Sequence, residues 1–332
     1  MMFKIVRYQS TGEFMRDSNI WPRFLGIFSI AAMMAACTTV GDVGDVPGGL
    51  AKVDLRVAVT PGPNEVYESR SKYQVPETHE IGNHVFPYEG VGWENEIVGY
   101  RLYLDERAVT DIFGKRTPDI VLDKVDYRSE YHDLADWGMD VMKVGPSLGV
   151  GGLGLYRGDN LERFGKKAQL SAEVLQESGA EVSFKVMHRQ VQLSDGGIGS
   201  VDTTYSLKSG SPLTWVSVKS TLPNKTLASG LVNNPKGKRI RNSNAVKKGE
   251  WRYIATWGDK QSEANDGLGT VLFYRDGDAR LMPTVNDTFP LRFNSSNPSY
   301  AFAGVWEQGP MGIANEKDFI AWADDQQKQL NK

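Results

Sequence analysis

The sequence predicts an all-β protein, a large antiparallel β-sandwich with one short C-terminal helix. Short runs with apolar residues at every second position recur along the chain and stop at turn residues. Glycine and proline, 35 and 15 residues, fill 50 of 332 positions, about 15%, slightly above the roughly 12% of average usage. Hydrophobic residues at 40% and charged residues at 24% exclude a disordered or collagen-like chain.

The strand signals are separated by turn chemistry. Residues 98–104 alternate apolar with small or polar side chains, and a run over 181–193 places Val182, Phe184 and Val186 on one face. Further runs and turns follow: strands at 201–207 and 213–219 joined through 208–212 as a hairpin, and a strand at 269–274 that ends in a turn at 275–278. This period of two favours a sandwich or barrel over a parallel α/β sheet.

Only the C-terminal tail has helical character. Asn315 can cap a helix whose first turn is polar, and an apolar stripe follows at Phe319, Ile320, Trp322 and Ala323. No repeat of fixed period is visible. We therefore expect one sandwich domain over 53–330, a size that all-β domains commonly reach.

The N-terminal segment has the pattern of a signal peptide. Arg16 and Arg23 precede a 13-residue apolar run at 24–36, which is too short to span a bilayer. The ending Met-Ala-Ala-Cys at 34–37 resembles a bacterial lipobox, so we expect cleavage after 36 and lipidation of Cys37. The alternative is an ordinary signal peptide with an incidental cysteine.

The expected mature protein is an exported lipoprotein. Residues 37–52 are rich in glycine and small side chains, as in a flexible tether. The lipid would attach the protein to the cell envelope, at the outer membrane or on its periplasmic face. The residue after the cysteine is Thr38 and not an aspartate, which favours outer-membrane sorting.

Composition excludes several classes of site and partner. A single cysteine cannot form an internal disulfide or a cysteine-built zinc or iron–sulfur site. A net charge of −3 argues against nucleic acid as the partner, because nucleic-acid-binding proteins are usually strongly basic.

The densest functional pattern lies at 131–145. It gathers one of only four histidines, three aspartates, a lysine and aromatic residues, with no apolar period to explain them. We interpret His132 as a general base, Lys143 or Tyr131 as its partner, and the carboxylates, Asp140 among them, as orienting groups. The alternative is a surface turn whose aspartates cap backbone amides.

Neither a metal nor a nucleotide cofactor is expected. Asp133, Asp136 and Asp140 could offer oxygens to calcium, but their spacing matches no EF-hand loop. The glycine-rich run at 149–154 lacks the following apolar helix of a dinucleotide site. We interpret it as a close approach of the backbone to another strand or to a ligand.

A second cluster lies at 93–101. On a continuous strand, Glu94 would lie on one side and Asn95 with Arg101 on the other. Trp93 beside acids, an amide and an arginine is a common combination for holding a sugar; a cross-strand ion pair over a core tryptophan is equally compatible.

Two further patterns can be explained by a ligand site or by ordinary structure. Trp251, Trp257 and Trp306 could line a groove or simply fill the core. The basic run at 235–248 is typical of an exposed loop, although it could attract an anionic polysaccharide.

The chain resembles the DUF4861 family, exported bacterial proteins often encoded among polysaccharide-degradation genes. The matching pieces are Trp93-Glu-Asn95 with Arg101, 131–140, 143–145 with 149–154, and Trp306-Glu307. The resemblance spans roughly 53–330. It implies a galactose-mutarotase-like or lyase-like sandwich and a role with uronate polysaccharides, and it carries over no catalytic residue.

We therefore expect an enzyme that cleaves uronate-containing saccharides by β-elimination, as a lyase or dehydratase. His132 would be the base, with Lys143, Tyr131 or Asp140 as partner, and Arg101 with Asn95 would hold the substrate carboxylate. Further substrate contacts are expected from Trp93, Glu94, Asp136 and Trp306.

Two alternatives remain. Hydrolysis or epimerisation would use Glu94 with Asp140, or His132 with Glu94. A non-catalytic glycan-binding lipoprotein would need only exposed aromatic residues on a shallow face.

Overall fold

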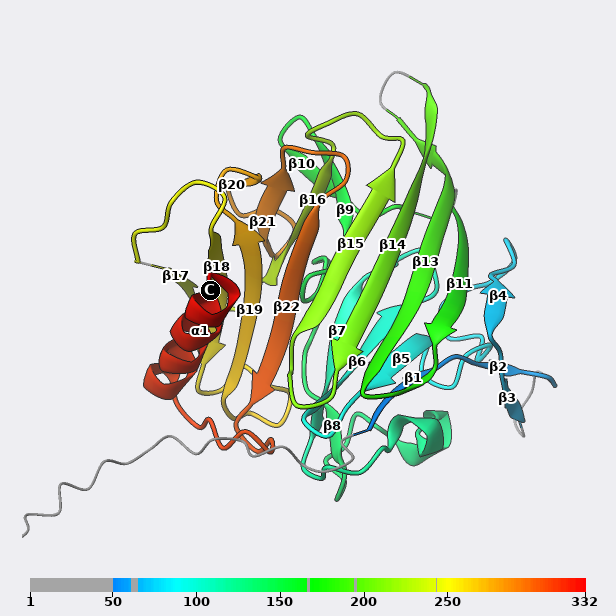
Figure 1. Cartoon of the computed structure of the whole chain (residues 1–332). Coiled ribbons are helices and arrows are strands. Elements are labelled where there is room, and N and C mark those ends of the chain that lie inside the picture. Colours follow the sequence, from blue (N-terminus) through cyan, green and yellow to red (C-terminus); the bar gives the residue numbers. More distant parts are fainter. Residues whose placement is uncertain (1–49, 61–64, 166–167, 194–195, 243) are drawn as a thin grey trace, which may run out of the picture. The chain divides into compact units, whose positions relative to one another are not determined.

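Antiparallel strands dominate the computed structural model, which describes residues 50–60, 65–165, 168–193, 196–242 and 244–332 (Figure 1). Most of these strands belong to three sheets, and a separate hairpin joins β2 (Arg56–Ala58) to β3 (Tyr67–Ser69). All described residues lie in one compact unit, Val43–Lys332. The predicted signal peptide, Cys37 and most of the predicted tether lie outside the described residues.

The largest sheet has nine strands. Their spatial order is β17 (Lys238–Arg241), β18 (Trp251–Gly258), β19 (Leu268–Arg275), β22 (Ser299–Trp306), β15 (Thr214–Ser220), β14 (Ile198–Lys208), β13 (Glu181–Gln192), β11 (Gln169–Gln176) and β4 (Lys72–Gln74). The strands predicted near 181–193, 201–207, 213–219 and 269–274 are all present, with the first two joined as a long hairpin.

Two smaller sheets complete the strand architecture. The six-stranded sheet has the order β12 (Ser178–Gly179), β1 (Ala51–Asp54), β5 (Gly90–Glu94), β6 (Val98–Tyr103), β7 (Thr110–Lys115) and β8 (Gly138–Asp140). The five-stranded sheet has the order β10 (Asn160–Glu162), β9 (Gly154–Arg157), β16 (Leu227–Val232), β21 (Thr288–Phe293) and β20 (Ala279–Leu281). Strand β1 begins at Ala51, inside the last two positions assigned to the tether.

The core lies between the nine-stranded sheet and the two smaller sheets. Trp93 on β5 packs against Phe184 on β13, with ring centroids 4.9 Å apart. Phe293 on β21 stacks on Tyr300 of β22 at 5.1 Å. Alternating inward side chains from facing sheets thus interdigitate as in a sandwich, and the predicted fold class is confirmed.

The one α-helix in the described residues is α1 (Glu316–Leu330), whose first turn is capped by the side chain of Asn315 through the N–H of Asp318. Figure 1 shows α1 lying along the β18–β19 end of the large sheet. Phe319 packs there at 5.4 Å from the ring of Trp257, so the helix covers the outer side of that end. Across the residues described, no helix combines the length and apolar content needed to cross a membrane.

The glycine run at 149–154 brings backbone against backbone, as the sequence indicated. Gly149 forms a bridge to Thr110 of β7 and has a φ of +74°. A Cβ atom at Gly149 would lie 1.8 Å from the carbonyl oxygen of Thr110, so no larger residue fits.

Candidate functional site

A row of charged side chains crosses the outer face of the six-stranded sheet. Arg101 on β6 lies directly opposite Asp111 on β7, and Asp140 on β8 lies opposite Phe113. Their neighbours Tyr100 and Ile112 belong to the main core. Because side chains alternate between the two faces of a strand, Arg101, Asp111 and Asp140 all point away from that core.

Arg101 is the centre of this row and is buried with 1% exposure. Its Nη2 donates to Asp111 Oδ2 at 2.7 Å, to Tyr103 Oη at 2.7 Å and to Asp140 Oδ2. The Tyr103 hydroxyl donates to the same oxygen of Asp111 at 2.6 Å. One guanidinium thus holds two carboxyl groups side by side, and it has little capacity left for a substrate carboxylate.

A cleft of about 350 Å³ opens above this row. Its lining includes Glu89, Arg101, Asp111, His132, Asp140 and Lys143. The structure therefore brings together four of the predicted residues, Arg101, His132, Asp140 and Lys143. Its size falls in the usual range for small-molecule sites, about 300–1,000 Å³.

His132 is held beside Asp140 by the backbone. The N–H of Asp140 donates to the carbonyl oxygen of Tyr131 at 2.8 Å, which fixes the loop against β8. His132 Nε2 lies 3.7 Å from Asp140 Oδ2, and the histidine side chain is 69% exposed. The imidazole can therefore meet a ligand while its nitrogen faces the buried carboxyl group.

The pKa values of these two groups move in opposite directions. Burial is the main cause that raises the pKa of Asp140 above its usual range, and repulsion from Asp111 adds to it while Arg101 opposes it. Burial also lowers the pKa of His132, with a further contribution from the positive charge of Arg101. Near neutral pH the pair therefore favours a neutral imidazole beside a carboxyl group that tends to keep its proton, an arrangement suited to acid–base chemistry.

Tyr131 lies beneath the cleft and not in it. Its ring packs on Phe113 at 5.8 Å and lies 5.4 Å from the Arg101 guanidinium carbon. Burial raises the pKa of Tyr131 to about 12, so the hydroxyl stays protonated at neutral pH. Tyr131 and Lys143 were the two residues predicted as the partner of His132. Of these two, Lys143 lines the cleft.

One wall of the cleft is an ion-pair chain that the sequence did not indicate. Arg107 Nη2 donates to Glu89 at 2.7 Å and also to Asp105, while its guanidinium carbon lies 3.8 Å from the centre of the Tyr103 ring. Glu89 has a φ of +70°, a costly conformation for a residue other than glycine. Within the described residues, Arg107 Nη1 and Lys143 Nζ have no hydrogen-bond partner, so both remain available to a ligand.

Glu94 and Asn95 have structural contacts instead of a place in the cleft. Glu94 is 1% exposed, accepts from Lys115 Nζ at 2.6 Å and accepts from the N–H groups of Val121 and Leu122. Asn95 spans the turn between β5 and β6 and donates to two carbonyl oxygens near residue 210. The prediction that Asn95 and Arg101 lie on the same side of the sheet was wrong. The chain reverses at Asn95, so strand parity does not extend across this residue.

The other predicted contacts also lie elsewhere. Trp93 is in the core, where its Nε1 donates to Thr214 Oγ1 at 2.8 Å, and Trp306 is 4% exposed with its Nε1 bound to Asp266 at 2.7 Å. Asp136 is exposed and does not line the cleft. Neither tryptophan offers a free ring face for sugar stacking in this cleft.

Some of the missed residues had a signal in the sequence. Asp111 is the one acid of its strand and directly precedes the apolar pair Ile112-Phe113, which is typical of a buried charge that needs a partner. Its pairing with Arg101 follows once 98–103 and 110–115 are read as adjacent strands. Glu263, which lines the cleft from a distant loop, had no such signal.

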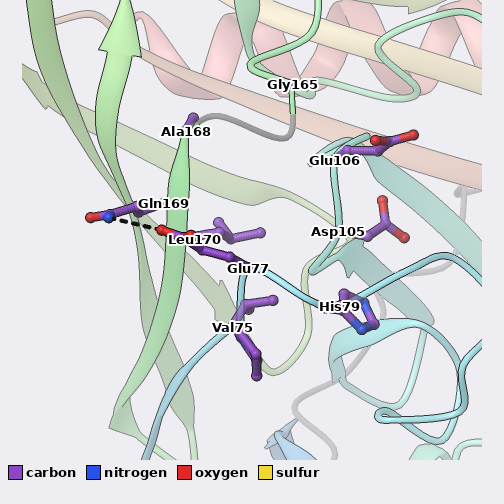
Figure 2. A pocket seen from close by; sticks show the side chains of 10 residues that line it. Val75, Glu77, His79, Asp105, Glu106, Gly165, Ala168, Gln169 and Leu170 are labelled. Carbon is purple, nitrogen blue, oxygen red and sulfur yellow. Dashed lines mark hydrogen bonds between the residues drawn. The ribbon is translucent and has the colours of Figure 1, made fainter.

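A second recess lies next to the first, on the other side of the Asp105–Arg107 ion pair. Figure 2 shows His79 and Asp105 facing it from one side and Leu170 from the other. Its volume is only about 40 Å³, room for water rather than for a sugar ring. Among the described residues, no group of three or more histidine, cysteine, aspartate or glutamate side chains is arranged to hold a metal ion.

Comparison with known proteins identifies the family. No curated protein and no solved structure matches the chain. One family model matches residues 52–332, nearly the whole of the described region, and it is described as a domain of unknown function. On that match, the chain belongs to the DUF4861 family.

Proposed function

We propose that the protein is an exported, carbohydrate-active lipoprotein that cleaves uronate-containing saccharides by β-elimination. The observation that carries the proposal is the pairing of His132 with Asp140 on the floor of a ligand-sized cleft, 3.7 Å apart and with pKa values shifted in opposite directions. Lipid attachment at Cys37 is part of the proposal and rests on the sequence pattern alone.

In the proposed reaction, neutral His132 removes the proton next to the substrate carboxylate. The electron pair forms a carbon–carbon double bond as the bond to the neighbouring glycosidic or hydroxyl oxygen breaks. The leaving oxygen receives that proton from His132, and Asp140 can exchange protons with the imidazole once the 3.7 Å between them shortens in the substrate complex. No proton is gained or lost overall.

The substrate carboxylate needs a cation with free hydrogen-bonding capacity. Arg101 was expected to supply it, but its Nη2 already serves Asp111 and Asp140. Lys143 and Arg107 Nη1 are the cationic groups of the cleft without such partners in the described structure, and we assign carboxylate binding to them. These positive groups would also stabilise the charge that develops on the carboxylate in the transition state.

The arrangement favours elimination over hydrolysis by Glu94 and Asp140. Glu94 is bound by buried Lys115 and by two backbone amides, so it cannot act as the second carboxylate at the cleft. Epimerisation shares the first proton abstraction and differs in where the proton returns. Product mass separates the reactions, since hydrolysis adds water, elimination does not, and epimerisation leaves the mass of the substrate unchanged.

The test incubates the purified protein with a panel of uronate polymers and oligosaccharides and follows the ultraviolet absorbance of the unsaturated uronate. His132→Ala is expected to lower turnover by about 10²–10⁴-fold, the usual contribution of a general base. The pH profile should fall on the acid side, below pH 6.5, where His132 gains its proton.

The matched control is Asp133→Ala, which changes an exposed neighbour outside the cleft lining and should leave turnover close to that of the unchanged protein. Lys143→Ala should raise KM more than it lowers kcat. The absence of a new chromophore with every uronate polymer would reject the elimination. If the unchanged protein turns over no substrate, and glycan binding survives in both His132→Ala and Lys143→Ala, the non-catalytic alternative is established instead.

A further inference from the structure

We infer that the protein has a second saccharide-binding site, for a neutral sugar unit, at the other end of the outer face of the six-stranded sheet. The site is a recess of about 550 Å³ beside β1, lined also by residues of β3, β11 and the 3₁₀ helix η1 (Leu122–Lys124). It shares no lining residue with the His132 cleft. The inference does not depend on the proposed reaction.

The recess and the His132 cleft lie along one row of paired residues. Asp54 on β1 is opposite Gly92 on β5, Gly92 is opposite Arg101, and Arg101 is opposite Asp111. Leu122, Val125 and Tyr131 pack with Tyr88 and Phe113 in a small apolar cluster on this face. Asp54 therefore has the same position at the recess as Asp111 has at the cleft. Each is a buried carboxyl group on the sheet, directly below an opening.

The back wall of the recess is rigid. Arg56 donates through Nε to both oxygens of Asp54 at 2.9 Å, and through Nη2 to the carbonyl oxygens of Leu122 at 2.7 Å and Val125 at 2.8 Å. The buried Tyr88 hydroxyl also donates to Asp54. A guanidinium held by this many contacts is preorganised, and binding costs it little conformational entropy.

Several polar atoms of the lining are unused by the described protein. Arg56 Nη1 and the hydroxyls of Ser69 and Ser71 make no hydrogen bond to any described residue. Asp123 uses only Oδ2, which binds Lys52 Nζ at 2.8 Å, while its Oδ1 is shielded from solvent and has no donor in the described structure. Because Oδ1 is closed to a ligand, Oδ2 is the oxygen of this 30% exposed side chain that a ligand can reach, and it can accept a second hydrogen bond beside Lys52.

The chemistry of the lining points to an uncharged, hydroxyl-rich ligand. Three cations and three carboxylates line the recess, and their charges cancel: Lys52, Arg56, Arg70, Asp54, Asp123 and Glu177. Sugar hydroxyls both donate and accept, which matches unused donors beside a carboxylate oxygen with remaining capacity to accept. Val174 and Leu175, the latter 48% exposed, offer an aliphatic wall for the C–H face of a sugar ring.

The test measures binding of neutral oligosaccharides (xylotetraose, cellotetraose and galactotetraose) to the full chain by isothermal titration calorimetry. We expect at least one to bind, and Asp123→Ala to weaken that binding about tenfold, which corresponds to the roughly 1.4 kcal/mol of one hydrogen bond to a charged group. Leu175→Glu is a second variant that removes the aliphatic wall without touching an ion pair. Asp119→Ala, an exposed aspartate of the same segment outside the lining, is the control and should leave affinity unchanged.

His132→Ala should leave neutral-sugar binding intact. The experiments can therefore reject this site without rejecting the proposed reaction, and the reverse. No binding of any neutral oligosaccharide at millimolar concentration would overturn the inference. Binding that is insensitive to both Asp123→Ala and Leu175→Glu would also overturn it, as would trigalacturonate binding here in preference to the neutral chains. Circular dichroism of each variant confirms that a loss of binding is not a loss of fold.

Discussion

At the scale of single residues, the candidate site is governed by an imbalance of charge around Arg101. Its guanidinium contacts Asp111 and Asp140, and Glu89 lies 3.7 Å from Nη1. Three carboxyl groups thus share one central cation, with Arg107 balancing Glu89 from the far side. A proton retained on Asp140 relieves the repulsion, which gives the raised pKa of that group a geometric cause.

The first prediction follows from the sign of that shift. Because the pKa of Asp140 is higher in the folded protein than the 3.8 of an ordinary aspartate, folding favours the protonated form. The free energy of unfolding should therefore decrease as the pH rises from about 4 through the raised pKa of about 8. Asp140→Asn keeps an oxygen for Arg101 but cannot ionise, so it should remove this slope in urea unfolding at pH 5, 7 and 9.

Asp136→Asn is the control for that measurement, because Asp136 is an exposed aspartate of the same loop. It should reproduce the pH dependence of the unchanged protein. If Asp140→Asn also keeps the full slope, the carboxyl group of Asp140 is ionised in the folded state, and its role as a proton partner of His132 fails.

How far the sequence predicts this site depends on the distance between its parts along the chain. His132, Asp140 and Lys143 come from one polar stretch that lacks an apolar period, so they could be selected together. Asp111 enters only through the register of two strands. Asn95 leaves the side of Arg101 because the chain turns there, and Glu94 is withdrawn from the site by its ion pair with Lys115. Registers and turns of this kind are set by non-local packing, which a short sequence window does not contain.

At the scale of elements, the cleft depends on the loop that leaves β8, which supplies residues 142–145 to the lining and forms a bridge to β7 at Gly149. The alternation over 98–104 correctly predicted β6, and the runs near 181–193, 201–207 and 213–219 became strands with one buried face. Strands β7 and β8 were not foreseen, because every residue of each is buried and their sequences show no clear alternation. The glycine run was interpretable because only a glycine tolerates the approach at Thr110.

The second prediction tests that approach. Gly149→Ala forces a methyl group to within 1.8 Å of the Thr110 carbonyl oxygen at a φ of +74°, so it should lower the free energy of unfolding by about 2–5 kcal/mol, from backbone strain and overpacking together. Gly158→Ala is the matched control: its φ is +59°, but no atom lies within 4 Å of the added methyl group, and it should cost about 1–2 kcal/mol. Equal losses in denaturant unfolding would show that backbone conformation alone, not the contact with β7, requires glycine at 149.

At the scale of the whole molecule, the described sheets share one hydrophobic core. That cluster includes Trp93 from the six-stranded sheet, Leu231 from the five-stranded sheet and Phe184 from the nine-stranded sheet. Both candidate binding sites lie on the far face of the six-stranded sheet, and a few members of the same cluster, such as Tyr103 at the cleft and Leu55 at the recess, also line them. A perturbation inside the core should therefore appear as cooperative unfolding that includes both openings.

His188 is a titratable group inside that sandwich. It continues the inward alternation of Val182, Phe184 and Val186 along β13, stacks on Phe164 at 4.1 Å and is 4% exposed. Both ring nitrogens are buried without a hydrogen-bond partner in the described structure. Burial lowers the pKa of His188 to about 3, because a charged imidazole would lose its hydration there.

The third prediction concerns acid stability. The unfolded chain protonates His188 near pH 6.5 and the folded chain only near pH 3, so stability present above pH 6.5 should be lost as the pH falls between these values. The loss can reach several kcal/mol, since each pKa unit corresponds to about 1.4 kcal/mol. His188→Met, which fills the space without titrating, should flatten the decline in thermal or urea unfolding between pH 7 and pH 4. His132→Gln, at a histidine whose side chain is 69% exposed, should retain it. An unchanged acid slope in His188→Met would mean that other groups set the acid limit of the fold, and that the core of β13 opens enough to hydrate this histidine.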